Sequence, residues 1–235
     1  MKYWLVLPAA GVGRRFGGAK QFAVLEERTV LELALQPFLD DPQCQGGVVA
    51  LATDEPRRDE FAARMPGRFS IIQGGSTRAH SVLNGLEALA ARAADTEWVL
   101  VHDAARPCLS GADLARLLSG AQGSAGALLA GRVADTVKQS RPAGPAEPVE
   151  CAATVPREAL WLAQTPQMFP LGALRAALQD ALARGRSPTD EAQAMEWQGV
   201  QARLIEARDT NMKITSAADL VLARAVLRAR REATI

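Results

Sequence analysis

The first loop of the chain reads Leu5-Val6-Leu7-Pro8-Ala9-Ala10-Gly11-Val12-Gly13-Arg14-Arg15-Phe16-Gly17-Gly18-Ala19-Lys20-Gln21. An apolar run over Tyr3–Leu7, typical of a buried strand, leads into it. The small residues that follow let the backbone approach a ligand closely, and Arg14, Arg15 and Lys20 place positive charge beside it. Backbone N–H groups, open space and cations at the end of a strand suit a phosphate ester. The loop therefore predicts a phosphate site, the alternative being an exposed Gly-rich loop without a ligand.

Two better-known phosphate loops do not match this segment. A dinucleotide fingerprint needs G-x-G-x-x-G, and here the third glycine, Gly17, comes one place late after Gly11 and Gly13. A P-loop ends in Gly-Lys-Ser/Thr, whereas this loop ends in Gly18-Ala19-Lys20-Gln21. A nicotinamide-dependent oxidoreductase is therefore disfavoured.

The composition is that of a globular protein of ordinary size. The 235 residues are 48% hydrophobic and 23% charged, enough for a single domain over 1–235, and the net charge of +1 disfavours a general nucleic-acid binder. The cysteines Cys44, Cys108 and Cys151 are odd in number and widely spaced, which favours a reducing compartment. The N-terminal apolar run is too short for a signal peptide, and no run is long enough for a membrane span. We expect a cytoplasmic protein that binds neither nucleic acid nor membrane.

Strand and helix signals alternate along the chain. Helices are expected from the capping box at Thr29 to near Pro37, and from 77 to 93 with Ser76 as N-cap. The apolar, non-alternating strands predict a mostly parallel sheet with helices on both faces, an α/β fold. Ligands bind at the carboxyl ends of such strands. If strands 3–7 and 98–101 are parallel neighbours, the opening loop and Asp103 lie on the same rim. The remaining expected strands are 48–52, 69–72, 126–130 and 202–206. One further helix is expected to end near 64, and four more to span 110–122, 171–184, 189–198 and 216–231.

One segment, 132–155, breaks this alternation. Two strand-like pieces, Asp135–Lys138 and Cys151–Val155, flank a proline-rich tip. This pattern predicts a protruding β-arm, with a disordered loop as the alternative. The open edge of such an arm would usually be covered by a partner subunit.

Asp103 follows the strand Trp98–Val101 and is a candidate Mg²⁺ ligand. Mg²⁺ takes one or two carboxylates and completes its shell with phosphate oxygens and water. An aspartate that only caps the next turn is the alternative. His102 would point to the opposite side of the extended chain and is predicted to be a packed, hydrogen-bonded histidine. No pairing of a nucleophile with a base is evident.

A second glycine turn, Gly74-Gly75-Ser76-Thr77-Arg78, opens the helix predicted over 77–93. Arg78 and Ser81 would share one face of it, suiting a base or ribose pocket or a second phosphate contact as well as a plain turn. For Thr189-Asp190-Glu191 a helix N-terminus is the favoured interpretation.

Taken together, these segments resemble the 2-C-methyl-D-erythritol 4-phosphate cytidylyltransferases of the non-mevalonate isoprenoid pathway. The motifs occur in order along nearly the whole chain. They are Pro8-Ala9-Ala10-Gly11-x-Gly13-Arg14-Arg15, Lys20-Gln21, Gly74-Gly75-x-x-Arg78-x-x-Ser81-Val82-x-x-Gly85-Leu86, His102-Asp103-Ala104-Ala105-Arg106-Pro107, Asp135-Thr136-x-Lys138, Thr154-Val155-x-Arg157, Gln164-Thr165-Pro166-Gln167, Thr189-Asp190-Glu191-Ala192 and Asn211-x-Lys213-x-Thr215.

The resemblance implies a Rossmann-like nucleotidyltransferase domain that forms a homodimer through the β-arm. It implies CMP transfer from CTP to 2-C-methyl-D-erythritol 4-phosphate, which forms 4-diphosphocytidyl-2-C-methyl-D-erythritol and pyrophosphate with Mg²⁺ as cofactor. For CTP, the resemblance implies backbone contacts from Ala9, Ala10, Gly11 and Gly13, contacts to cytosine from Gly75, Ser76 and Ser81, and a contact to the ribose from Ala104. It implies that Asp103 binds Mg²⁺ and that the catalytic residues are Arg15, Lys20 and Lys213. The methylerythritol phosphate would be bound by Arg106, Thr136, Arg157 and Lys213. Asp209 is weighed as a second metal ligand.

Two other functions remain open on the sequence. A ribitol 5-phosphate cytidylyltransferase would share most of these motifs. A CTP-binding protein without turnover would keep the fold, although the presence of Arg15, Lys20 and Asp103 together weighs against it.

Overall fold

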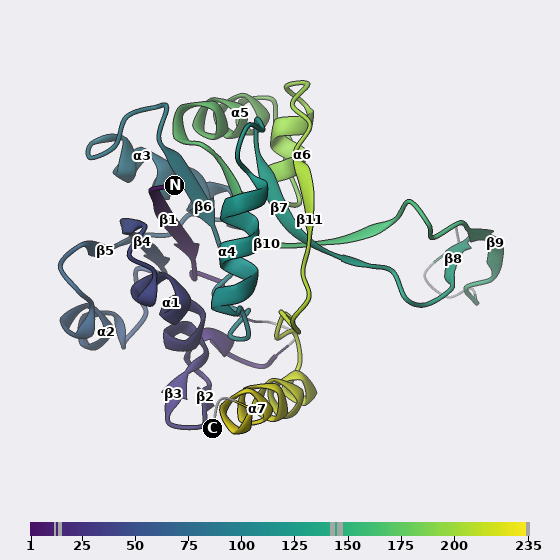
Figure 1. Ribbon diagram of the computed structural model, residues 1–235, viewed down its shortest axis with the longest axis horizontal. Helices are drawn as coiled ribbons and strands as arrows, with labels where there is room; N and C mark the ends of the chain where they lie inside the picture. Colours follow the sequence, from purple (N-terminus) through teal and green to yellow (C-terminus); the bar gives the residue numbers. More distant parts are fainter. Residues whose placement is uncertain (12, 14–15, 142–143, 145–147, 234–235) are drawn as a thin grey trace.

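The fold is described from a computed structural model, which covers residues 1–11, 13, 16–141, 144 and 148–233. A seven-stranded sheet with the order β11-β7-β10-β6-β1-β4-β5 forms its centre (Figure 1). Neighbouring strands run parallel except β10, which is antiparallel to both β6 and β7. This confirms the mostly parallel sheet of an α/β fold. The strands are β1 (Tyr3–Pro8), β4 (Cys44–Leu51), β5 (Phe69–Gln73), β6 (Trp98–Val101), β7 (Ala127–Arg132), β10 (Trp161–Pro170) and β11 (Arg203–Glu206).

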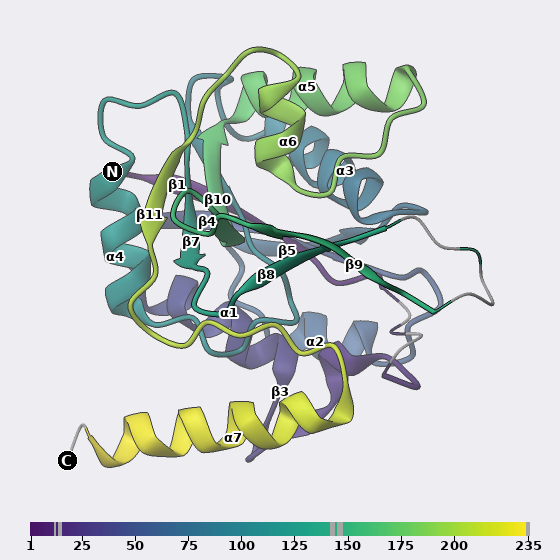
Figure 2. The same cartoon turned by 90° about the vertical axis from the view of Figure 1, so that its right-hand side faces the viewer.

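Helices cover both faces of the sheet, because its strands are apolar on both sides. Leu5 and Leu7 of β1 belong to one buried cluster with α1, α2 and α4, whereas Trp4 and Val6 belong to another with α3, α5 and α6 (Figure 2). Alternate residues of a strand point to opposite faces, so one strand serves both layers. The helices are α1 (Val30–Asp40), α2 (Arg58–Arg64), α3 (Arg78–Ala90), α4 (Gly111–Gly120), α5 (Leu171–Ala183) and α6 (Glu191–Glu196).

The register of β1 and β6 brings two chemical segments to one rim of the sheet. Val6 pairs in parallel with Val101, so the loop after β1 and the segment that begins at His102 leave neighbouring strand ends. The predicted proximity of the opening loop and Asp103 is therefore confirmed.

Strand β10 has no counterpart in the sequence-based prediction. Its sequence contains Pro166 and several polar residues, which disfavour a central strand. The pairing with β7 shifts register between Ala163 and Gln167, and Pro166 lies within this irregularity. Proline is tolerated at such a bulge because no ladder hydrogen bond is needed from it.

Two predicted helix boundaries are wrong. Helix α1 has the expected capping box at Thr29 but continues through Pro37 to Asp40, and Phe38 in its last turn is fully buried in the core. Helix α3 is capped by Thr77 rather than Ser76, because Thr77 has the extended backbone and accepts from the N–H of His80. Both residue types cap helices well, so composition alone could not choose between them.

The predicted arm is present and leaves the body between β7 and β10 (Figure 1). Its strands β8 (Val137–Ser140) and β9 (Cys151–Val155) pair only with each other, as an antiparallel hairpin with largely exposed residues.

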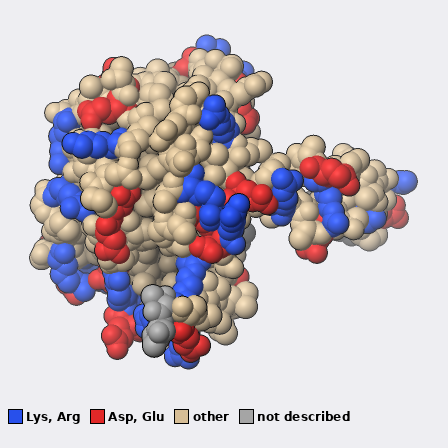
Figure 3. Space-filling view, viewed as in Figure 1, with Lys and Arg blue, Asp and Glu red and all other residues tan. Residues whose placement is uncertain are grey.

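A third cluster closes the molecule near the C-terminus. It joins α7 (Ala217–Glu232) to β2 (Val24–Leu25) and α1, through buried residues that include Ile214 and Ala223. The opening loop is followed by η1 (Lys20–Phe22), and β3 (Arg28–Thr29) pairs with β2. Within the described part of the chain, no helix is long and apolar enough to cross a bilayer. Charges of both signs are interspersed over the face in Figure 3.

Candidate active site

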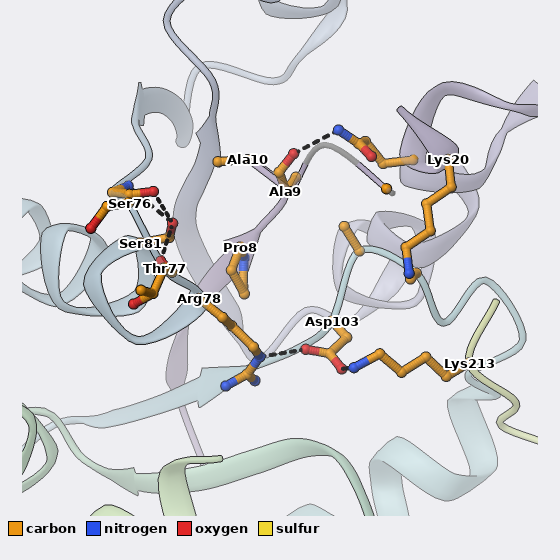
Figure 4. Close-up of a pocket in the computed structure, with 16 residues that line it drawn as sticks. Pro8, Ala9, Ala10, Lys20, Ser76, Thr77, Arg78, Ser81, Asp103 and Lys213 are labelled. Atoms are coloured by element: carbon orange, nitrogen blue, oxygen red, sulfur yellow. Dashed lines mark hydrogen bonds and ion pairs between the residues drawn. The ribbon is translucent and has the colours of Figure 1, made fainter. Parts of the chain in front are cut away.

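A hollow of about 480 Å³ lies at the rim where β1 and β6 end (Figure 4). It is bounded by the opening loop, the start of α3, the segment after β6, and Lys213. The described lining residues are Pro8, Ala9, Ala10, Gly11, Gly13, Lys20, Gln21, Gly75, Ser76, Thr77, Arg78, Ser81, Asp103, Ala104, Ala105 and Lys213. Most of the residues predicted to contact CTP are thereby brought together.

The opening loop is folded around the carbonyl of Gly13. This oxygen accepts from the N–H groups of Phe16 and Gly17, at 2.8 and 3.1 Å. Gly13 has a φ of 62°, and a Cβ there would lie 1.9 Å from the carbonyl oxygen of Gly18. Only glycine fits this turn. Gly11, in contrast, faces open space, since a Cβ there would meet nothing within 4 Å.

Lys20 lines the hollow, at the end of the opening loop. Its Nζ donates to the carbonyl oxygen of Ile214 at 2.8 Å, which joins the opening loop to the segment that carries Lys213. The next residue, Gln21, donates through Nε2 to the carbonyl of Ala9 at 2.9 Å and fixes the base of the loop. Arg15 lies outside the described residues, so its role stays a prediction.

The second glycine turn forms the opposite wall. The Ser81 hydroxyl accepts from the N–H of Gly75 at 3.0 Å and donates to the carbonyl of Thr77 at 2.9 Å. A Cβ on Gly74 would lie 2.3 Å from the Cβ of Ala10, so this glycine allows the two loops to touch. Ser81 thus shapes the wall, and Ser76 is exposed at its edge.

Asp103 is the only carboxylate among the described lining residues of this hollow, and both of its oxygens meet cations. Arg78 Nε lies 2.8 Å from Oδ1, and Lys213 Nζ lies 2.7 Å from Oδ2 (Figure 4). Burial alone would raise the pKa of Asp103, but Arg78 and Lys213 hold it well below its usual range. The carboxylate is therefore ionised throughout the physiological pH range.

A hydrogen-bond chain fixes the backbone of Asp103. His102 Nε2 must donate to the carbonyl of Arg106, because a carbonyl only accepts, so Nδ1 of the neutral ring accepts from the Thr165 hydroxyl. The Thr165 oxygen in turn accepts from the N–H of Asp103 at 3.0 Å. Burial lowers the pKa of His102 to about 4, which keeps the ring neutral. The prediction of a packed, hydrogen-bonded His102 is confirmed.

Thr165 was not among the individual site residues predicted from sequence. It belongs to the quoted Gln164–Gln167 motif, but its contact with Asp103 depends on strand β10, which was not predicted. The buried amide of Asn211 also reaches this strand, donating through Nδ2 to the carbonyl of Thr165 at 2.7 Å.

A second hollow, of about 250 Å³, adjoins the first. The two share Arg78, Asp103 and Lys213. Arg106 lines only this second hollow, where its Nη1 donates to the carbonyl of Asn211 at 2.7 Å. The remaining described lining residues are Ala163, Gln164, Thr165, Gln167, Thr189 and Asp190.

Two predicted substrate-binding residues lie elsewhere in the chain. Thr136, just before β8, and Arg157, just after β9, are exposed and are not among the described lining residues of either hollow. Arg157 instead donates through Nη1 to the carbonyl of Ala134. Asp209, considered as a second metal ligand, is also not among the described lining residues of either hollow. Its backbone N–H donates to the carboxylate of Asp113.

Comparisons with known proteins agree with this arrangement of the site. The model of one family, described as 2-C-methyl-D-erythritol 4-phosphate cytidylyltransferase, matches residues 3–229. The chain belongs to this family. It is therefore a nucleotidyltransferase, and the functional assignment that the motifs suggested is borne out at the level of the family.

Individual members of the cytidylyltransferase family match over nearly their whole length. The Halorhodospira halophila protein of that name is 48% identical over 241 residues, covering 99% of this chain and 97% of the relative. A crystal structure of a 4-diphosphocytidyl-2C-methyl-D-erythritol synthase superposes with a TM-score of 0.82 at 36% identity, covering 96% of this chain and 98% of that one. The Francisella tularensis cytidylyltransferase structure gives a TM-score of 0.82 at 31% identity, covering 96% and 100%.

Proposed function

We propose that this protein transfers CMP from CTP to 2-C-methyl-D-erythritol 4-phosphate and releases pyrophosphate. The observation that carries the proposal is the pair of adjoining hollows that share Arg78, Asp103 and Lys213. A reaction that joins a nucleotide to a second phosphate needs two binding sites that meet where the new bond forms. The family to which the chain belongs supplies the identity of the two substrates.

The larger hollow suits the nucleotide. Backbone from Ala9 to Gly13 would contact the phosphates, with Arg15 and Lys20 neutralising their charge. The wall formed by Gly75, Ser76 and Ser81 would lie against cytosine, and Ala104 near the ribose. The smaller hollow, with Arg106 and the shared Lys213, suits the methylerythritol phosphate, because both residues are cations.

The chemistry needs position and charge rather than a protein nucleophile. A phosphate oxygen of the polyol substrate attacks the α-phosphorus of CTP, the bond from that phosphorus to its bridging oxygen breaks, and pyrophosphate leaves with the electron pair. Such transfers are catalysed by alignment and by neutralising the charge on the phosphoryl oxygens. Lys20 and Lys213 stand at the hollow that would hold these groups.

The donor set also fits Mg²⁺. Among the described residues there is no cluster of three or more His, Cys, Asp or Glu, so a metal held by protein side chains alone is not favoured. Mg²⁺ bound to a nucleotide needs only one or two carboxylates, and Asp103 would supply one. When bound, the ion would neutralise phosphate charge. It would share the Asp103 carboxylate with Lys213, which lies on Oδ2.

We further propose one nucleotidyltransferase domain over residues 1–235 that dimerises in the cytoplasm through its arm (132–155). Thr136 and Arg157 are not among the described lining residues of their own chain's hollows, so their role in substrate binding would be to act on a partner's site. The unpaired edges of the hairpin support this arrangement.

The test of the reaction is pyrophosphate release by the purified protein with CTP, Mg²⁺ and 2-C-methyl-D-erythritol 4-phosphate. A higher kcat/KM for ribitol 5-phosphate would replace the proposed substrate. Tight CTP binding without turnover on either polyol phosphate would indicate a protein that binds CTP without catalysis.

The test of the shared site mixes two inactive variants, Lys20→Ala and Arg157→Ala, after subunit exchange. If the arm serves the partner's site, a mixed dimer contains one intact site and activity returns. If Arg157 acts within its own chain, every site lacks one group and the mixture stays inactive.

A further inference from the structure

Glu191 is a buried carboxylate that the proposed reaction does not yet use. It is the first residue of α6 and is 1% exposed. A charged group is rarely buried without a partner, because removing it from water is unfavourable. Its partner is Arg78, whose Nη1 and Nη2 lie 2.7 and 3.0 Å from the two carboxylate oxygens.

The position of Glu191 is fixed from both sides by one glutamine of β10. Gln167 donates through Nε2 to Asp190 at 2.9 Å and accepts through Oε1 from the N–H of Ala192 at 2.8 Å. Asp190 also caps α6 by accepting from the N–H of Gln193. The start of α6 is thereby fastened to the sheet, with Glu191 held between the two contacts.

Arg78 uses all three of its guanidinium nitrogens within the protein. Two bind Glu191, and Nε lies 2.8 Å from Oδ1 of Asp103. Burial alone would lower the pKa of Arg78, but Glu191 and Asp103 raise it above its usual value. The order Glu191–Arg78–Asp103–Lys213 is thus an alternating array of charges, and all of its members except Glu191 line both hollows.

We propose that Glu191 is a positioning residue that, through Arg78, sets the orientation of the Asp103 carboxylate. The planar fork of arginine binds a carboxylate through two nitrogens. With Glu191 occupying that fork, Arg78 reaches Asp103 only through Nε and only at Oδ1. Oδ2 faces Lys213 at 2.7 Å, with Arg106 Nε farther away at 3.9 Å, at the boundary of the two hollows. Without the charge of Glu191, the guanidinium group of Arg78 can rotate so that its two terminal nitrogens bind both carboxylate oxygens of Asp103.

This inference rests on the proposed function, and its first test is Glu191→Gln, which keeps shape and removes charge. We expect kcat to fall roughly 10- to 100-fold, as for other residues that orient a functional ligand. KM for CTP should change much less, because Glu191 is not among the described lining residues of the larger hollow. Glu191→Asp, which restores the charge, should recover part of the loss. Glu196→Gln, at the exposed end of the same helix, is the matched control and should behave as wild type.

A double variant separates positioning from stability. Glu191→Gln alone leaves Arg78 with less compensation and should lower Tm, whereas Arg78→Gln with Glu191→Gln removes both charges and should restore much of it. If Glu191 positions Asp103, activity stays low in the double variant although Tm recovers. Activity that recovers with Tm, or a Glu191→Gln enzyme with wild-type kcat, overturns the proposal. Inactivity of the wild type with CTP and both polyol phosphates would instead refute the proposed function.

Discussion

The ammonium group of Lys213 lies 2.7 Å from Oδ2 of Asp103, at the boundary of the two hollows. The contact joins the segment before α7 to the end of β6, which are far apart in sequence. In the proposed reaction, a phosphate that enters either hollow would compete with Asp103 for this lysine. Lys213 would then exchange a carboxylate of the protein for a phosphate of the substrate without leaving the site.

Replacing Lys213 by methionine should lower kcat roughly 10²- to 10³-fold, the usual effect of losing one donor to transition-state charge. Steady-state kinetics with both substrates measures this. Lys2→Met, an exposed lysine in front of β1, is the control and should leave kcat unchanged. A Lys213→Met enzyme with near-normal kcat would remove Lys213 from the catalytic residues.

Lys20→Ala and Arg15→Ala should each lower kcat by roughly 10²–10³, since each removes a cation that we propose neutralises the triphosphate. Single-turnover measurements with CTP separate this loss from weaker binding. Normal kcat in both variants would mean that the loop positions CTP through its backbone alone.

Asp103→Asn should weaken the Mg²⁺ dependence of the reaction, because an amide is a poorer magnesium ligand than a carboxylate. The measurement is initial rate against Mg²⁺ concentration at saturating CTP. The pKa of Asp103 is held well below its usual range, so the wild-type rate should show no step from this group near pH 4. An unchanged metal titration in the variant would exclude Asp103 as a ligand.

Thr165→Val should destabilise the protein by about 1–3 kcal/mol, because the buried N–H of Asp103 loses its acceptor. It should also lower kcat, since Asp103 is no longer fixed. Thr165→Ser keeps the hydroxyl and should retain most of both properties. Chemical denaturation and kinetics on the two variants give the comparison, and equal behaviour of Val and Ser would contradict the role of the hydroxyl.

His102 should make folding stability depend on acid pH. Burial lowers its pKa from 6.5 to about 4, so the unfolded chain binds the proton first as the pH falls. The titration of His102 leaves the unfolding free energy unchanged above pH 6.5 and lowers it as the pH falls, by about 3 kcal/mol at pH 4.

Urea denaturation between pH 7 and pH 4 measures this effect by difference. His102→Gln should show a shallower fall of the unfolding free energy than wild type. The expectation fails if wild type and His102→Gln lose stability in parallel.

The sequence predicts those parts of the molecule that depend on local signals. The apolar strand Tyr3–Leu7 and the capping box at Thr29 each express a rule that acts over a few residues, and both are found. The opening loop and Asp103 come together as expected because β1 and β6 are parallel neighbours. The pairings of β10 are not predicted from the sequence, because this strand violates the usual residue preferences of a strand, and its contact with Asp103 through Thr165 depends on those pairings.

The charge array in the site could not be predicted from the sequence either. Arg78, Asp103 and Glu191 come from the start of α3, the end of β6 and the start of α6, and no spacing rule relates them. Glu191 was interpreted as part of a helix start, which it is. Its burial against Arg78 is visible only in three dimensions. Thr136 and Arg157 illustrate the opposite case, since the motif resemblance implies a place in the substrate site, whereas neither residue is among the described lining of the two hollows.

Strand β10 connects the arm with the candidate active site. The same ten-residue strand starts at the base of the arm with Trp161, contacts Asp103 through Thr165 and fastens α6 through Gln167. The strand therefore connects the arm directly with the backbone of Asp103 and with the start of α6. In the proposed dimer, a partner subunit that binds the hairpin would contact the same continuous segment that positions Asp103.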